Sequence, residues 1–213
     1  MKNWFVAMLL LSGCAANPAD QVPSAQVGSA SPAPVSAAST PASPAPAASS
    51  VRLALDPSKS KVGFVGSKVT GSHEGGFKEV SGAIELVDND PVRSKVQVEI
   101  KVSSMFTDDN DLTEHLLSPD FFDAKQFPQA TFVSKAIEKS SAGFEVVGDL
   151  SMHGTTREIR FPAQIQASPS EVKVNSEFSI NRFDFGMKYP GKADNLIRKE
   201  VVIKLDVVAT PAP

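Results

Sequence analysis

From Val51 onward, apolar and polar residues alternate along the chain in a series of short runs. In the clearest run, residues 96–102, four aliphatic residues are separated by Gln97, Glu99 and Lys101. A period of two places the apolar side chains on one face of a β-strand and the polar side chains on the other. The same alternation recurs over residues 144–152, 159–165, 172–180 and 201–207. These runs predict strands with one buried and one solvated face.

Turn-forming residues separate the predicted strands, as at residues 88–91 and at His153-Gly154. Three further stretches, at residues 62–65, 77–87 and 131–137, raise the total to about eight antiparallel strands. Their short connections favour a meander. A sheet of about this size that closes on itself has no free edges and encloses room for one small ligand. The predicted fold is therefore all-β, a closed antiparallel barrel of about eight strands with a short helical insert, and a sandwich is the alternative.

The predicted insert lies between the strands at residues 96–102 and 131–137. Residues 111–114, Asp-Leu-Thr-Glu, have the pattern of an N-terminal capping box with Asp111 as the cap. Pro119 ends this helix near the residue before it, and Asp111 is expected to pair with His115 one turn along. Residues 121–127 then contain three phenylalanines, too apolar for a bare loop, which indicates that the insert packs over one end of the barrel.

The first 14 residues have the features of a targeting segment. Lys2 precedes an apolar run of eight residues, 4–11, which is too short to span a bilayer as a helix. Leu11-Ser12-Gly13-Cys14 resembles the lipobox of bacterial lipoproteins, in which the cysteine sulfur receives a diacylglycerol and becomes the first residue. That resemblance implies that Cys14 is a lipid anchor, and Ala15 after it favours the outer membrane, with the protein facing the periplasm. An ordinary signal peptide with an incidental cysteine is the alternative.

Residues 15–50 are rich in small residues and proline, with 12 Ala, 8 Ser and 7 Pro, and Asp20 is their only charged residue. Such a segment has too little apolar surface to offset the entropy of ordering it. The sequence therefore predicts a disordered linker over residues 15–50 that lets the barrel domain, residues 51–209, stand away from the membrane.

Charge and residue counts exclude several other functions. The net charge of −3 argues against nucleic acid as a partner. A single cysteine excludes a disulfide framework within one chain and a multi-thiolate metal site. The three histidines, His73, His115 and His153, are not spaced as metal ligands, and residues 108–111 lack the glycine and the distant glutamate of an EF-hand. No nucleophile motif or cofactor motif is present, so we predict neither an enzyme nor a metal or cofactor.

Several motifs resemble those of the YceI-like family of bacterial envelope proteins. They are Asp111, His115-Leu116, residues 118–123 (Ser-Pro-Asp-Phe-Phe-Asp), Phe127-Pro128 through Thr131-Phe132, Gly76-Phe77, Gly82, Gly148-Asp149-Leu150, His153-Gly154 and residues 182–187 (Arg-Phe-Asp-Phe-Gly-Met). The resemblance covers roughly residues 54–208. One departure is visible at residues 56–60, Asp-Pro-Ser-Lys-Ser, where the family often has Asp-x-x-His-Ser. The resemblance implies a lipocalin-like barrel whose interior holds a polyisoprenoid or a similar long-chain amphiphile.

On this basis we predict a membrane-anchored lipoprotein that binds an isoprenoid-like or fatty amphiphile for storage, transfer or sensing. The candidate pocket residues are Phe64, Phe77, Phe121, Phe122, Phe132, Phe183 and Phe185. Arg182 is the candidate contact for a ligand head group, or else forms a structural ion pair with Asp184. The alternative function is a structural or interaction module whose barrel is filled by its own side chains and binds no ligand.

Overall fold

The computed structural model describes residues 16–28, 49–193 and 195–211, and 13 strands form within them. The strands are β1 (Gln26–Val27), β2 (Ser50–Leu55), β3 (Lys61–Lys68), β4 (Gly71–Phe77), β5 (Val80–Val87), β6 (Asp90–Lys101), β7 (Met105–Thr107), β8 (Gln129–Ser140), β9 (Gly143–Met152), β10 (Thr155–Ser168), β11 (Glu171–Asn181), β12 (Gly191–Lys192) and β13 (Asn195–Pro211). The helices are α1 (Asn110–Leu117) and three short 3-10 helices, η1 (Pro18–Gln21), η2 (Val102–Ser104) and η3 (Arg182–Phe185). The described part of the chain contains no helix long and apolar enough to cross a membrane.

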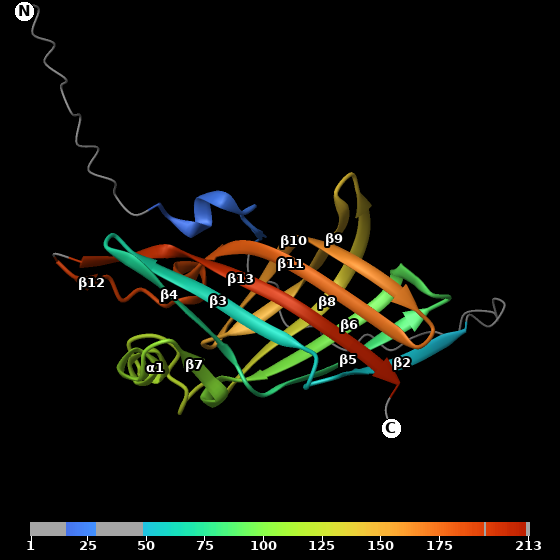
Figure 1. Ribbon diagram of the computed structural model, residues 1–213, viewed down its shortest axis with the longest axis horizontal. Coiled ribbons are helices and arrows are strands. Elements are labelled where there is room, and N and C mark those ends of the chain that lie inside the picture. Colours follow the sequence, from blue (N-terminus) through green and yellow to red (C-terminus); the bar gives the residue numbers. More distant parts are fainter. Residues whose placement is uncertain (1–15, 29–48, 194, 212–213) are drawn as a thin grey trace, which may run out of the picture.

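The strands form a closed antiparallel barrel. Three pairs, β2 with β3, β4 with β5 and β6 with β7, each act as one long interrupted strand, because both members of a pair run beside the same neighbouring strands. These three composite strands are followed by β8, β9, β10, β11 and β13, and each pairs antiparallel with the next. The last strand, β13, pairs with β2 and β3 and closes the ring, which confirms the predicted eight-stranded barrel. The strands run obliquely along the long axis of the molecule (Figure 1).

Each predicted alternation corresponds to a strand, and tight turns join several of them. The turn between β5 and β6 has positive φ at Asp88 (52°) and Asn89 (56°), and the turn between β9 and β10 has positive φ at His153 (49°) and Gly154 (68°). Two successive positive φ values are the geometry of turns that suit the twist of a hairpin. The strand β2 and, apart from Phe77, the strand β4 were missing from the sequence prediction, although Leu53 of β2 is completely buried.

One end of the barrel is filled by its own side chains. Leu53, Ile84, Leu86, Val172 and Ala209, all at most 2% exposed, form the centre of an apolar cluster contributed by β2, β5, β11 and β13. In Figure 1 this end lies to the right, where β2 and the end of β13 are found, whereas α1 and β12 lie to the left. The two ends of the barrel therefore differ, and the α1 end is the one left to hold a ligand.

The helical insert is present, but its cap differs from the prediction. Asp109, not Asp111, is the N-cap, and its carboxylate accepts a hydrogen bond from the backbone N–H of Leu112 at 3.2 Å. Asp111 lies inside the helix, in its first turn. The helix ends where Pro119 predicted, with Ser118 as the C-cap. The choice of cap depends on the path by which β7 enters the helix, which the local sequence pattern does not contain.

The predicted linker is not disordered throughout, because residues 16–28 form part of the barrel wall. β10 and β11 pair only over residues 164–168 and 171–175, and beyond that point the two strands separate. The N-terminal segment fills the gap: Ala25 N–H donates to the Ser179 carbonyl at 2.8 Å, and β1 pairs with β10. The hydrogen bonds that these residues form with two exposed strand edges offset the entropy cost of ordering the segment. The composition alone had suggested that this cost could not be offset. The rest of the predicted linker, apart from Ser49 and Ser50, and the targeting segment with Cys14 lie outside the described residues.

Candidate functional site

A cavity of about 460 Å³ occupies the half of the barrel nearest α1. Its wall comes mainly from the inward-facing positions of the strands, as in β3, where Val62, Phe64, Gly66 and Lys68 alternate along it and Gly63 and Ser67 also contribute. The remaining lining residues from strands are mostly apolar: Phe77, Val98, Ile100, Ala130, Phe132, Leu150, Met152, Ile159, Phe161, Phe178, Ile197, Val201, Ile203, Leu205 and Val207. The volume lies within the usual range of sites for one small molecule.

Aromatic rings form much of the wall and contact one another. Phe161 and Phe178 stack at a centroid distance of 4.3 Å, and Phe132 meets Phe161 edge-on at 5.7 Å. On the facing side, the Phe77 ring is 5.9 Å from Phe64 and 6.3 Å from Phe122. Rings held by such contacts are stiff, so the cavity has a defined shape before any ligand enters.

Of the seven phenylalanines predicted to line a pocket, the structure brings five to the cavity: Phe64, Phe77, Phe121, Phe122 and Phe132. The other two lie outside it. Phe185 is completely buried in the core around the cavity, and Phe183 is 38% exposed at the surface. Both residues lie in the 3-10 helix η3, in which side chains two positions apart point in different directions. The sequence analysis missed Phe161 and Phe178, although both lie on the apolar face of predicted strands.

Arg182 lies at the cavity wall but is occupied by the protein backbone. Its side chain is 4% exposed and donates hydrogen bonds to four carbonyl oxygens, those of Met187 (2.6 Å), Tyr189 (2.7 Å), Arg198 (3.1 Å) and Ile197 (3.3 Å). Burial lowers the pKa of Arg182. The guanidinium therefore fastens the segment after η3 to β13, and among the described residues it forms no ion pair with the Asp184 carboxylate.

Polar side chains gather at the mouth of the cavity, where α1 faces the start of β13. His115 of α1 is 5.1 Å from the ring of Tyr189, and its Nε2 atom lies 3.0 Å from a carboxylate oxygen of Asp120, not of Asp111 as predicted. His73 of β4 lies 2.9 Å from Asp108, and this hydrogen bond lowers the pKa of the Asp108 carboxyl group. Lys68, Lys192, Asn195 and Arg198 also line this end of the cavity.

The inner cavity offers little for chemistry. Within the described ranges, no three His, Cys, Asp or Glu side chains come together as a metal site would require. The deepest lining residues are aliphatic or aromatic, and the ionisable side chains stand at the mouth. Such an arrangement suits an elongated molecule with an apolar chain inside and a polar group at the entrance.

Comparisons with known proteins agree with this architecture. A UPF0312 protein of Pseudomonas putida (strain GB-1) is 29% identical over 137 residues, which cover 61% of this chain and 71% of that protein. The crystal structure of Burkholderia cenocepacia BcnA is 29% identical, with a TM-score of 0.65, and the match covers 73% of this chain and 99% of that one. A polyisoprenoid-binding domain from Saccharophagus degradans, 19% identical, shares the fold with a TM-score of 0.61 over 75% of this chain and 98% of its own.

The match to a family model covers most of the chain. The model of the YceI-like domain matches residues 53–209, which include every strand of the barrel from β3 to β12, the second half of β2 and nearly all of β13. This range also contains all the lining residues of the cavity. The protein belongs to the YceI-like family.

Proposed function

We propose that this protein binds one long-chain amphiphile, a polyisoprenoid or a fatty-acid derivative, in the hollow half of its barrel. The observation that carries the proposal is the cavity of about 460 Å³, walled by apolar side chains and reached through a polar mouth. The name of the Saccharophagus degradans domain, a polyisoprenoid-binding domain of the same fold, supports the choice of ligand class.

The energetics favour a long chain over a short one. Burying one methylene contributes about 0.8 kcal/mol, so ten buried carbons contribute about 8 kcal/mol. Association itself costs on the order of 4–15 kcal/mol in lost freedom. A ligand with only ten buried carbons would therefore bind weakly, and a chain of about 20 carbons would bind tightly without a strong polar contact. Selectivity then depends on chain length more than on the head group.

We also propose that the protein works at the cell envelope, anchored by an acylated Cys14 in the outer membrane and facing the periplasm. The lipobox pattern before Cys14 supports the anchor, and Ala15 supports the outer membrane. Two or more acyl chains hold a protein stably on a bilayer, where one chain is marginal. A binding protein in this place can store, transfer or sense its ligand.

Solvent extraction of the purified protein tests the ligand. The full chain is produced in a bacterial envelope, purified in a mild detergent and extracted with organic solvent, and the extract is analysed by mass spectrometry. We expect a stoichiometric long-chain lipid, or uptake of added polyprenol by the extracted protein after detergent removal. Clean protein that takes up no polyprenol would instead support the alternative of a structural module.

A further inference from the structure

Two large apolar side chains are exposed side by side at the mouth of the cavity. Val69, in the turn between β3 and β4, is 43% exposed, and Leu196, at the start of β13, is 49% exposed. The backbone N–H of Val69 donates to the Leu196 carbonyl at 3.2 Å, so the two residues are neighbours. Neither side chain lines the cavity. They project from the rim at the point where a ligand enters.

Lysines lie in the chain segments next to this apolar pair. Lys68 precedes Val69, Lys192 lies in β12, and Lys188 is exposed in the segment that leads to β12. Residues 187–199 contain four Lys or Arg and one acidic residue, Asp194. None of Lys68, Lys188 and Lys192 forms an ion pair with a carboxylate of the described residues. We call the surface of Lys68, Val69, Lys188, Lys192 and Leu196 the basic rim.

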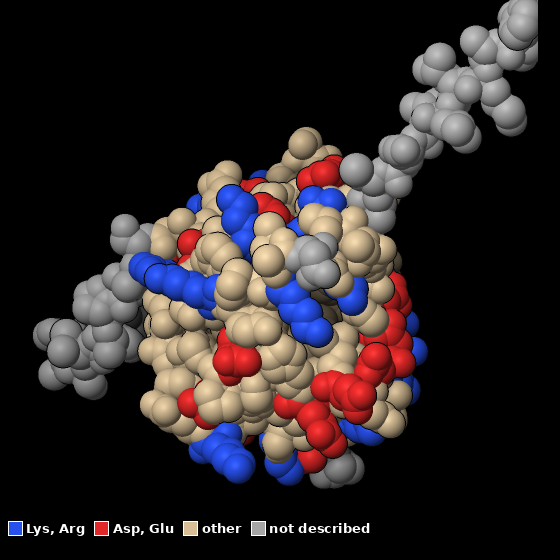
Figure 2. Space-filling view, turned by 90° about the vertical axis from the view of Figure 1, so that its left-hand side faces the viewer, with Lys and Arg blue, Asp and Glu red and all other residues tan. Residues whose placement is uncertain are grey.

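The opposite side of the mouth has the opposite charge. Residues 107–124, which include α1, contain six Asp or Glu and no Lys or Arg. In the end-on view of Figure 2, basic side chains gather over the upper middle of the face, and acidic side chains follow its lower right. A negatively charged surface would therefore attract the basic rim and repel the α1 side, which defines one orientation.

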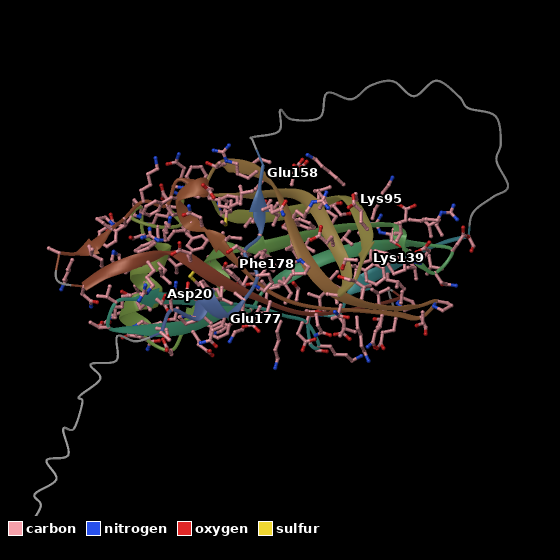
Figure 3. All side chains as sticks on the ribbon, turned by 90° about the horizontal axis from the view of Figure 1, so that it is seen from above. Asp20, Lys95, Lys139, Glu158, Glu177 and Phe178 are labelled. Atoms are coloured by element: carbon pink, nitrogen blue, oxygen red, sulfur yellow. The ribbon has the colours of Figure 1, made fainter. Side chains whose placement is uncertain are left out.

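The N-terminal segment reaches the barrel close to the basic rim. The hydroxyl of Ser67, the residue before Lys68, donates to the side chain of Asn17 at 3.2 Å. Ala19 packs against Val65 and Val202. In Figure 1, η1 lies on the side of β3 and β13 and α1 on the other side, and in Figure 3 Asp20 of η1 is nearer the mouth end than Lys95 and Lys139. Cys14 precedes Ala16 by two residues, at most about 7 Å of extended chain.

We propose that the basic rim docks on an anionic lipid bilayer, so that the mouth opens onto the membrane and the ligand passes directly between bilayer and cavity. Val69 and Leu196 enter the interface, and the lysines contact lipid phosphates. The short reach from Ala16, next to the docked Asn17, to Cys14 holds the rim against the bilayer that contains the acyl chains. This inference rests on the proposed lipid anchor and ligand, and it reverses the expectation that a linker lets the domain stand away from the membrane.

Direct passage has a physical advantage for such a ligand. A chain of about 20 carbons that left the bilayer through water would expose its apolar surface, at a cost of about 0.8 kcal/mol per methylene. With the mouth on the bilayer, the chain moves from one apolar environment to another. Each lysine near an anionic surface contributes an attraction that corresponds to about a fivefold change in binding.

Fluorescent labels at two positions test the orientation. Val69→Cys at the rim and Lys139→Cys at the opposite end are each introduced into the full acylated chain, whose Cys14 is blocked by its lipid. Both are labelled with an environment-sensitive dye and reconstituted into phosphatidylcholine vesicles with phosphatidylglycerol and nitroxide-labelled lipid. We expect quenching and a blue shift for the label at position 69 and neither for the label at 139. Equal quenching at both positions, or none at 69, would overturn the proposal.

A transfer experiment tests passage from the bilayer. The double variant Val69→Asp with Leu196→Asp is compared with Lys139→Asp as the matched control at the far end. Because neither rim residue lines the cavity, affinity for a fluorescent polyprenol delivered from cyclodextrin should stay unchanged. Transfer of the same polyprenol from anionic vesicles should slow tenfold or more in the rim variant alone. An unchanged transfer rate in the rim variant would refute docking of the basic rim on the bilayer. If the unmodified protein did not bind polyprenol at all, the proposed ligand would be refuted instead.

Discussion

A larger side chain placed inside the cavity should weaken ligand binding without lowering the stability of the fold. Gly66 of β3 is a position at which this can be tested. Gly66 lines the cavity, and a Cβ atom added there would meet nothing within 4 Å. The variant Gly66→Leu therefore places four carbons in the empty space without a clash. Gly71, at the start of β4, also has open space around an added Cβ but does not line the cavity. Gly71→Leu is thus a matched control with the same chemical change.

The two effects of Gly66→Leu have opposite signs. The new side chain takes the place of about four carbons of ligand, which at about 0.8 kcal/mol each removes about 3 kcal/mol of binding energy, or roughly a hundredfold in affinity. In the ligand-free protein the leucine replaces a glycine within a strand and gains partial burial, so the free energy of unfolding should stay the same or rise by about 1 kcal/mol.

Titration with a fluorescent isoprenoid alcohol measures the affinity, and urea unfolding of ligand-free protein measures the stability. The Gly71→Leu variant should match the unmodified protein in affinity. If Gly66→Leu folds as well as the unmodified protein and binds as tightly, the ligand does not occupy this cavity. If Gly66→Leu fails to fold while Gly71→Leu folds, the empty space inferred beside β3 is not there.

Two further predictions concern residues outside the apolar wall. Arg182→Lys should lower the free energy of unfolding by about 2–4 kcal/mol in urea titrations, because an ammonium group cannot satisfy the four carbonyls that the guanidinium reaches; normal stability with weakened ligand binding would restore Arg182 as a head-group contact. The hydrogen bond from the Ser58 side chain, and then Lys59, hold the pKa of Asp56 at about 2 against an unfolded value of 3.8. A depressed folded pKa stabilises the fold above pH 3.8, and the contribution is lost as the pH falls through about 2. The stability difference between the unmodified protein and Asp56→Asn should therefore shrink over that window in acid unfolding curves, and a constant difference would contradict this account.

The alternation of apolar and polar residues predicted the strands and favoured the barrel. Runs such as residues 96–102 have a clear period of two, and a meander of about eight such strands removes its free edges by closing, although the pattern alone also allowed a sandwich. The interrupted strands were harder to predict: β2 and β3 act as one strand, but the turn at residues 56–60 hides their continuity along β13. The five phenylalanines that reach the cavity were found because they stand on the apolar face of a strand or in the insert.

Only the tertiary structure decided which half of the barrel is hollow. Leu53 and Leu86 at one end and Ile203 and Phe178 at the other have the same local pattern. The first two pack into an apolar cluster, whereas the other two line the cavity. The partners of Arg182 are backbone carbonyls 5 to 16 residues further along the chain. Backbone carbonyls leave no sequence pattern, so no motif around Arg182 distinguishes a head-group contact from a structural one.

The N-terminal segment shows most clearly what the sequence alone could not predict. Composition describes what residues 16–28 can bury by themselves, which is little. Their order comes from unpaired strand edges on β10 and β11, which exist only once the barrel has formed. The sequence by itself therefore determined the strands, the closed sheet and the candidate anchor at Cys14. The tertiary structure determined the cavity, the carbonyl partners of Arg182 and the place of residues 16–28 on the barrel wall, because each depends on contacts that no local sequence pattern contains.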